Sequence, residues 1–360
     1  MGKILTTTVQ DSTRRLSGRM RVTLDVIRAL AASYVVIHHV VVNSGLSGPV
    51  TYPFRFGQEA VIVFFLLSGF LIFASERSRV LGNLRGYYLR RLRRIYPLLL
   101  LAMGITAAVA WLDGALAEGF RAIDFGLNLL SLQDVSALKP GVIVDPFLGN
   151  SPLWSLSYEV FFYLVFPLVM IAWRVSRQRA IMVVGAVSLI GYGTFLCAPN
   201  HFSLVAAYLL TWWAGAVVAD LYQTNRLSIR GLLPITVWMV GLCAVAGIGA
   251  IVFGRSGAGV FPVLPLRHFA FALLCILLCG TSLAAVLIKT AQPFARPAAY
   301  IASISYGLYV FHYPLLVQWE GAHTPIGFAL ALILLVITAI LGDRLLERVM
   351  PRPARITAQA

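Results

Sequence analysis

The chain has 360 residues, of which 59% are hydrophobic and only 12% carry a charge, and its mean hydropathy is +0.84. Soluble domains contain about 45–50% apolar and about 25% charged residues, so this composition excludes a soluble globular protein. The formal net charge of +15 does not indicate a nucleic-acid partner, because the basic residues fall mostly in short segments between long apolar runs and not on a solvated face.

Apolar runs of membrane-spanning length follow one another along the chain. We predict an all-α polytopic membrane protein with about ten transmembrane helices, near 22–44, 58–76, 95–112, 152–173, 180–197, 203–222, 231–253, 266–288, 298–318 and 326–345. The sequence divides into a basic cytoplasmic N-terminal segment (1–21), a ten-helix membrane domain (22–345) and a cytoplasmic tail (346–360).

The distribution of Lys and Arg predicts that both termini face the cytoplasm, since these residues are retained on that side during insertion. The segments assigned to the inside contain Arg77, Arg79, Arg85, Arg90, Arg91, Arg93, Arg94, Arg174, Arg177, Arg179, Arg226, Arg230, Lys289, Arg296, Arg344, Arg348, Arg352 and Arg355. Those assigned to the outside contain only Arg55, Arg121, Lys139, Arg255 and Arg267. The Arg- and Ala-rich composition suggests a bacterial plasma (inner) membrane.

The four cysteines show no metal-site spacing, and we expect no metal.

The first apolar run contains two ionisable residues on one face. Ionisable side chains are costly inside a membrane and are therefore candidates for function. Arg28 and His39 are eleven residues apart, which places them on one helix face about 16 Å apart along the axis. The alternative is that the histidine is a buried hydrogen bonder that holds helices together.

Two further polar residues are predicted to lie at the depth of His39. Glu159 is about two turns inside the outer end of its helix, and His312 is about as deep as His39. If these faces converge, the three side chains form a polar cluster suited to proton transfer. For His312, a purely structural role as a buried hydrogen bonder between helices is an interpretation of equal weight.

Two other stretches combine a structural and a functional interpretation. The small pair Ser68–Gly69 suits either close helix packing or the approach of a substrate to the backbone. The basic run RGYYLRRLRRIYP suits either attraction to anionic lipid or phosphate binding, because guanidinium groups hold phosphates through paired hydrogen bonds.

Five stretches in this order resemble the acyltransferase-3 family of integral-membrane acyltransferases, which includes O-antigen, exopolysaccharide and Nod-factor O-acetyltransferases. They are LDVIRALAASYVVIHH, VFFLLSGFLIF, YYLRRLRRIYP, LWSLSYEVFFYLVFPL and SYGLYVFHYPLL, and they cover almost the whole chain. The resemblance implies a membrane O-acyltransferase that takes an acyl group, with acetyl expected first, from cytoplasmic acyl-CoA. The group is delivered to a hydroxyl of an extracytoplasmic or lipid-linked glycan.

The resemblance also assigns roles to residues. Carried over position by position, the family's Arg-x10-His pattern falls on Arg28 and His39, its Arg-x-x-Arg pattern on Arg91 and Arg94, its Ser-Gly-Phe on Ser68, Gly69 and Phe70, and its acidic Trp-Ser-Leu position on Glu159. The chain has Ile62 where many members carry an acid, and Glu59 lies one turn away.

These assignments give a mechanistic hypothesis. His39 is the general base or the nucleophile of an acyl-histidine, and Glu159 orients or reprotonates its imidazole. The arginines, with Ser68, Gly69 and Phe70, bind acyl-CoA, and His312, Tyr313 and Trp154 are candidate acceptor or supporting contacts. A glycan or lipid-linked-sugar transporter or flippase without transfer chemistry is the alternative, and a scaffold is a further one. The sequence leaves the oligomeric state open.

Overall fold

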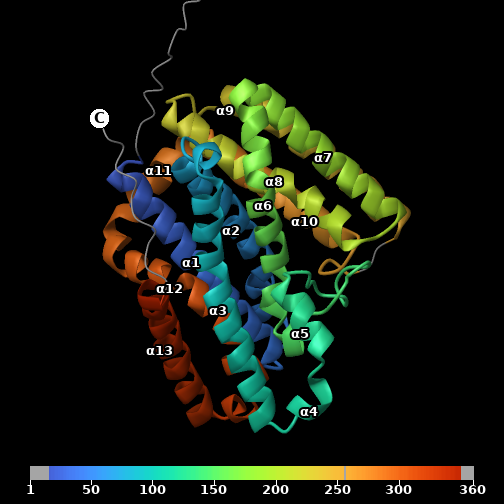
Figure 1. The fold of residues 1–360 in the computed structure, drawn as a ribbon, viewed down its shortest axis with the longest axis vertical. Helices are drawn as coiled ribbons and strands as arrows, with labels where there is room; N and C mark the ends of the chain where they lie inside the picture. The colour runs from blue at the N-terminus through green and yellow to red at the C-terminus, as the bar shows by residue number, and fades with distance from the viewer. Residues whose placement is uncertain (1–15, 255–256, 350–360) are drawn as a thin grey trace, which may run out of the picture.

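The chain folds into long helices joined by short turns (Figure 1). The computed structural model describes residues 16–254 and 257–349. The long helices are α1 (Gly18–Asn43), α2 (Gly57–Glu76), α3 (Leu84–Leu112), α6 (Trp154–Val175), α7 (Arg177–Cys197), α8 (His201–Gln223), α9 (Ile229–Val252), α10 (Val263–Cys279), α12 (Ala295–Tyr313) and α13 (Pro325–Val349). The short elements are η1 (Pro49–Phe54), η2 (Val80–Gly82), α4 (Leu116–Gly119), α5 (Ala122–Leu129), η3 (Phe147–Gly149), η4 (Ser151–Leu153), α11 (Ser282–Ala291), η5 (Gln292–Phe294), η6 (Pro314–Gln318) and η7 (Glu320–His323). The terminal segments predicted at 1–21 and 346–360 fall largely outside the described residues.

Several helices begin at a capping side chain, which explains why they extend beyond the apolar runs. A side-chain oxygen that accepts a backbone N–H of the first turn satisfies a donor that has no partner within the helix. Asn83 accepts from the N–H of Gly86 at 2.7 Å, so α3 begins about eleven residues before the predicted start and includes the whole arginine run. The other side-chain caps are Ser17, Ser176, Asn200, Ser228 and Thr281.

The prediction of about ten spanning helices differs from the structure at one place. Within 16–254 and 257–349, eight helices are long and apolar enough to cross a membrane, or nine if Val263–Cys279 and Ser282–Gln318 form one bent span. The axis turns by 85° between these two segments, so the predicted helix 266–288 is broken. The physical reason is a helix stop at Gly280 followed at once by Thr281, whose extended backbone and side-chain cap start α11.

Contacts between distant residues give each helix its direction. His39 of α1 lies within hydrogen-bond distance of His312 of α12, and nearer the start of both helices Ala29 packs with Ala298. Because the residue numbers rise together along the two helices, α1 and α12 run parallel. The same comparison shows that α1, α3, α7, α9 and α12 run one way and that α2, α6, α8, α10 and α13 run the other. We call the end where α1 begins the arginine end and the end where α1 finishes the histidine end.

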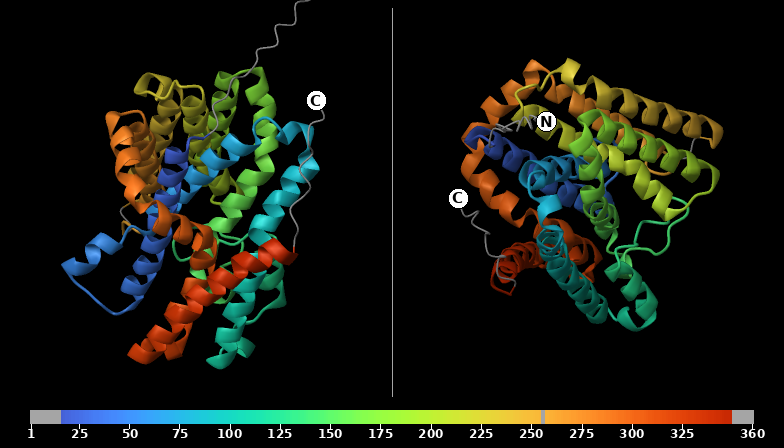
Figure 2. Two further views of the ribbon diagram at one scale, coloured as in Figure 1. Left: turned by 90° about the vertical axis from the view of Figure 1, so that its left-hand side faces the viewer. Right: turned by 45° about the horizontal axis from the view of Figure 1, so that its top comes forward.

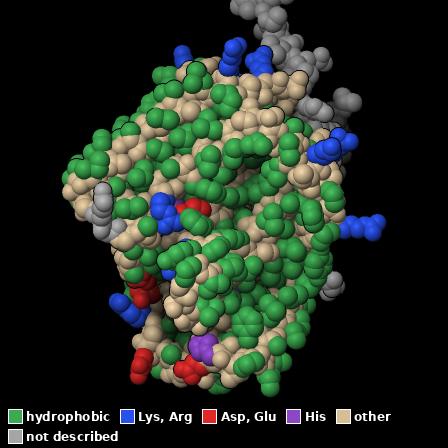
Figure 3. Space-filling model, turned by 180° about the vertical axis from the view of Figure 1, so that it is seen from behind, with side chains coloured by type: hydrophobic (Ala, Val, Ile, Leu, Met, Phe, Trp, Pro, Cys, Tyr) green, Lys and Arg blue, Asp and Glu red, His purple; other side chains and the backbone are tan. Residues whose placement is uncertain are grey.

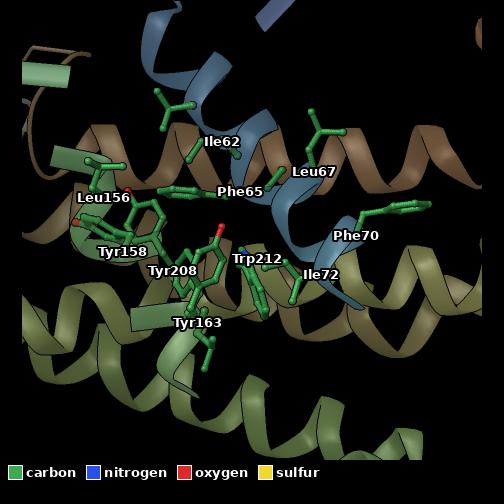
Figure 4. Packing of buried hydrophobic residues seen from close by; sticks show 14 of the residues in the cluster. Ile62, Phe65, Leu67, Phe70, Ile72, Leu156, Tyr158, Tyr163, Tyr208 and Trp212 are labelled. Carbon is green, nitrogen blue, oxygen red and sulfur yellow. The ribbon is translucent and has the colours of Figure 1, made fainter. Parts of the chain in front are cut away.

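The core of the bundle surrounds α8, of whose most apolar 18 residues 89% are buried. Helices α2 and α8 touch backbone to backbone: a Cβ on Gly69 would lie 1.9 Å from the carbonyl oxygen of Trp212, and one on Gly215 would lie 2.0 Å from that of Leu66. Only glycine permits such an approach. Aromatic rings from α2, α6 and α8, including Phe65 and Tyr208, fill the space beside this contact (Figure 4).

The outside of the bundle is apolar, as expected for a protein in lipid. Large hydrophobic side chains are exposed along most long helices, for example Leu168 (65%) and Ile190 (69%). Figure 3 shows a face that is mainly hydrophobic, with Lys and Arg side chains mostly along its upper edge and one side. In Figure 2, α3 and α13 lie on one side of the bundle and α7, α9 and α10 on the other. The protein is therefore a multi-pass membrane protein.

Candidate functional site

A cavity of about 390 Å³ opens between α1, α2, α3, α6 and α12. Its polar lining includes Arg28 of α1, Ser68 of α2, Glu159 of α6, and Arg90, Arg91 and Arg94 of α3. The sequence assigned Arg28, Ser68, Arg91 and Arg94 to donor binding, and the tertiary structure brings these four residues to one cavity.

Two of the arginines make no direct contact with a carboxylate in the described part of the chain. Within the described residues, Arg28 and Arg94 make no ion pair or hydrogen bond, although the Arg94 guanidinium lies 5.5 Å from the ring of Tyr306. Nε of Arg91 is buried without a hydrogen-bond partner, and its guanidinium lies over the ring of Tyr163 at 5.5 Å. Buried donors without partners are costly, so the cavity is suited to an anion with several acceptor oxygens.

Glu159 lies in this cavity and not beside the histidines. Tyr163 and Ser68 both donate hydrogen bonds to Oε1 of Glu159, the second at 3.3 Å, and Nε1 of Trp212 donates to the Ser68 oxygen at 3.2 Å. The prediction that Glu159 would join His39 and His312 in one cluster is therefore wrong, because the side chain is tied to α2 and to its own helix.

The two histidines do meet at the histidine end. Nε2 of His312 lies 3.0 Å from Nδ1 of His39, and the two rings are 5.0 Å apart between centroids. Nδ1 of His312 lies 3.0 Å from the carbonyl oxygen of Leu308, and Nδ1 of His39 lies 3.0 Å from that of Val35.

These carbonyl partners determine where the protons are. A carbonyl oxygen only accepts, so both Nδ1 atoms carry hydrogen, and Nε2 of neutral His312 is an acceptor. The N–H of His39 is then shared between Val35 and His312, which leaves a lone pair on Nε2 of His39. That atom has no hydrogen bond within the described residues and is not fully enclosed by them. An imidazole held in this tautomer can act as a base or a nucleophile.

An aromatic partition separates the cavity from the histidine pair. Tyr309 lines the cavity, its ring lies 6.3 Å from that of His312, and Phe64 contacts it at 5.9 Å. The Tyr309 hydroxyl donates to the Pro152 carbonyl at 2.7 Å and lies 2.8 Å from the Ser155 oxygen. The Tyr309 ring thus lies between the cavity and His312, with the Phe64 ring packed against it.

Three other predicted residues lie outside the cavity. Gly69 packs against the Trp212 backbone, as the packing interpretation predicts, and it does not line the cavity. Phe70 lines a second, almost wholly apolar cavity of about 430 Å³ on the other side of α2. Trp154 is buried, with its ring 3.9 Å from Nζ of Lys139.

Trp154 therefore anchors the loop between α5 and η3 to α6. Lys139 pairs there with Asp134 at 2.6 Å, and burial lowers the pKa of Lys139 while Asp134 opposes that shift.

Tyr313, which the sequence also singled out, lies beside the histidine pair, since its ring stands edge-on to that of His39 at 5.2 Å.

The sequence analysis missed one residue beside the cavity. Glu76, the last residue of α2, is fully buried and accepts hydrogen bonds from Arg79, Arg90 and Arg91. The available signal was an acidic residue at the end of the second apolar run, followed first by Arg77 and Arg79 and then by the densest arginine run, in a chain with 14 acids and 29 bases.

Known proteins resemble the chain over most of its length. An acyltransferase domain model, that of the acyltransferase 3 family, matches residues 21–342. "Nodulation protein 10" of Rhizobium leguminosarum bv. viciae is 26% identical over 80% of this chain and 81% of its own length. "Putative membrane-bound transacylase BcsY" of Komagataeibacter xylinus is 24% identical over 89% of this chain and 81% of its own.

"O-acetyltransferase OatA" of Staphylococcus aureus is 26% identical over 82% of this chain, which spans half of that protein. No solved structure matches the chain. The match to the family model extends from α1 into α13 and includes the arginine cavity and the histidine pair. The chain belongs to the acyltransferase 3 family of membrane proteins.

Proposed function

We propose that the protein is a membrane O-acyltransferase that moves an acyl group, first of all acetyl, from cytoplasmic acyl-CoA to a hydroxyl of an extracytoplasmic or lipid-linked glycan. The observation that carries this proposal is the division of labour along α1. Arg28 faces the cavity that the arginines of α3 line, and His39 presents a free imidazole nitrogen about 16 Å away along the helix axis.

The arginine cavity fits the donor in this proposal. Acyl-CoA carries phosphate groups on its nucleotide and a thin arm that ends in the thioester. Arg28 and Arg94 make no ion pair or hydrogen bond within the described residues, and Nε of Arg91 has no hydrogen-bond partner. These groups would hold the phosphates, while Oε2 of Glu159, which has no hydrogen bond there, would accept an amide N–H of the arm.

His39 carries the chemistry by one of two routes. In direct transfer, Nε2 of His39 takes the proton of the acceptor hydroxyl, the oxygen bonds to the acyl carbon, the carbon–sulfur bond breaks and the thiolate receives that proton. In the covalent route, Nε2 first bonds to the acyl carbon and the thiolate leaves; the acceptor oxygen then displaces the imidazole, and its proton goes to the released thiolate. His312 and Tyr313 keep the ring in place.

The same proposal sets the topology. The exposed Arg and Lys residues at the arginine end support a cytoplasmic location for that end. We therefore propose ten crossings, with α10 and α12 each counted as one, and both termini in the cytoplasm; the alternating helix directions support this topology. A bacterial plasma (inner) membrane is the expected location.

The test uses purified protein in lipid nanodiscs with radiolabelled acetyl-CoA and a crude surface-glycan fraction. We expect wild type to release CoA and to label the glycan, and His39→Ala to lose both by at least about 100-fold, the usual contribution of a general base. The matched control is His323→Ala, which removes an exposed histidine of η7 at the same end of the bundle and should keep full activity.

Each outcome is informative. If His39→Ala folds and keeps its activity, His39 is not the reactive group. If wild type neither binds nor uses acyl-CoA but moves a labelled lipid-linked glycan across a vesicle membrane, the transporter alternative replaces the transferase. Mass spectrometry of the His39 peptide, quenched with acetyl-CoA and no acceptor, separates the two routes, because only the covalent route leaves an acetyl group there.

A further inference from the structure

The buried carboxylate of Glu76 lies at the edge of the arginine cavity without lining it. Its side chain is 0% exposed, whereas those of Arg90 and Arg91 are 22% and 19% exposed and line the cavity. Glu76 ends α2, and the two arginines belong to the second turn of α3. One carboxylate thus joins the end of one helix to the beginning of the next, beside the site.

The hydrogen bonds to this carboxylate are shared unequally. Arg79 donates through Nε and Nη2, both at 2.9 Å, and Arg90 donates through the same two atoms at 2.9 and 2.7 Å. These two forks occupy the four favourable acceptor positions of a carboxylate. Arg91 is left with one contact of 3.3 Å from Nη2, and its Nε is buried without a partner.

The charge balance around Glu76 also favours an anionic ligand. One negative charge faces three guanidinium groups, which leaves an excess of two positive charges beside the cavity. Like charges at this spacing repel, and an arginine free to rotate would extend to the membrane surface. The carboxylate therefore keeps the guanidinium groups together. Arg91 uses only one of its N–H donors for this contact, and its other donors stay available to a ligand.

We propose that Glu76 is a positioning residue that holds Arg90 and Arg91 toward the cavity and thereby makes the enzyme select a thioester donor that carries phosphate groups. This inference rests on the proposed acyltransferase function. Because Glu76 itself does not line the cavity, it acts through the arginines and not by contact with the donor.

The test compares two donors that share a reactive end. Acetyl-CoA carries phosphates, and S-acetyl-N-acetylcysteamine has the same thioester without them. For Glu76→Gln we expect KM for acetyl-CoA to rise about 10- to 100-fold, the scale of charge-assisted hydrogen bonds, with kcat within about twofold. The kcat/KM for the truncated thioester should stay within about twofold of wild type, because that donor does not use the arginines.

Two further variants keep the result interpretable. Glu76→Asp retains the charge but withdraws the carboxylate by one methylene, so it should fold and show a smaller, equally selective rise in KM. Arg85→Gln removes an exposed arginine of α3 that does not line the cavity, and it should behave as wild type with both donors.

Direct binding of CoA, measured by calorimetry in nanodiscs, separates the possible failures. If wild type binds CoA and uses acetyl-CoA, and Glu76→Gln matches it, the role of Glu76 is refuted and the transferase stands. Equal losses with both donors in Glu76→Gln or in Glu76→Asp would show a purely structural role and also overturn the inference. If wild type neither binds CoA nor uses either thioester, both proposals fall.

Discussion

The two ends of α1 carry polar sites of opposite character. At the arginine end, Arg28 faces a cavity whose guanidinium groups have donors to spare within the described residues. At the histidine end, His39 and His312 satisfy each other and two backbone carbonyls, so a single ring nitrogen of His39 is left without a partner. Excess donors suit the binding of a polyanion, whereas a fixed tautomer suits proton transfer or nucleophilic attack.

Under the proposed function, this difference means that the donor is bound and the acyl group transferred at separate places along the helix axis. The Tyr309 and Phe64 rings lie between the two sites. Substitutions at the arginine end should therefore change KM for the donor, and those at the histidine end should change kcat. The predictions below test that division.

The largest effect is expected for His312→Ala. The imidazole of His39 loses the acceptor that holds its ring and keeps only the Val35 carbonyl, so kcat should fall about 10- to 100-fold, which is at most the lower limit of the contribution of a group that itself transfers the proton. The measurement is kcat with saturating acetyl-CoA, and KM for acetyl-CoA should stay within about twofold. His312→Gln offers an amide oxygen in place of Nε2 and should recover part of the rate. A selective change in KM would contradict the division.

A smaller effect is expected for Arg94→Gln at the other end. The loss of one guanidinium that contacts phosphate should raise KM for acetyl-CoA about tenfold and leave kcat within about twofold, as for the loss of one charged hydrogen bond. Added salt should weaken donor binding less in this variant than in wild type, because one fewer positive charge is left for the salt to screen. Arg85→Gln is the control, and a fall in kcat at constant KM would contradict this prediction.

The smallest effect is expected at the partition. Phe64→Ala removes one of the two rings between the sites, so a longer acyl chain should fit beside Tyr309. We expect the ratio of kcat/KM for hexanoyl-CoA to that for acetyl-CoA to rise about three- to tenfold, at or below the lower limit for one methylene in a hydrophobic pocket, because the chain is only partly accommodated. Phe202→Ala, an exposed phenylalanine of α8, is the control. An unchanged ratio would show that these rings do not limit the acyl chain.

Predictions from the sequence were more accurate for features that depend on neighbouring residues than for features that depend on contacts between distant ones. Spans set by local hydropathy, such as that of α9, were correct within a few residues, because a continuous apolar run is a local property. The predicted span 266–288 failed because hydropathy does not register the stop at Gly280 and the cap at Thr281. A search for that stop-and-cap pair could have found the break.

The candidate site shows the same limit. Helical spacing predicted that Arg28 and His39 lie on one face, since both side chains belong to one element. Depth alone could not predict that Glu159 bonds Ser68 and Tyr163 instead of the histidines. A match in depth leaves open which neighbour a helix turns toward, and that depends on the packing of several helices at once.

The sequence by itself determined the membrane class, the approximate spans, the family resemblance and the candidate residues, because composition, hydropathy and motif order are written in consecutive residues. The tertiary structure decided which of those residues meet. It paired His39 with His312, placed Glu159 among the arginines, assigned Gly69 to helix packing and revealed Glu76 as the counter-ion of the cluster. The physical reason is that hydrogen bonds and ion pairs act over about 3 Å, whereas the residues that form them here lie up to 273 positions apart in the chain.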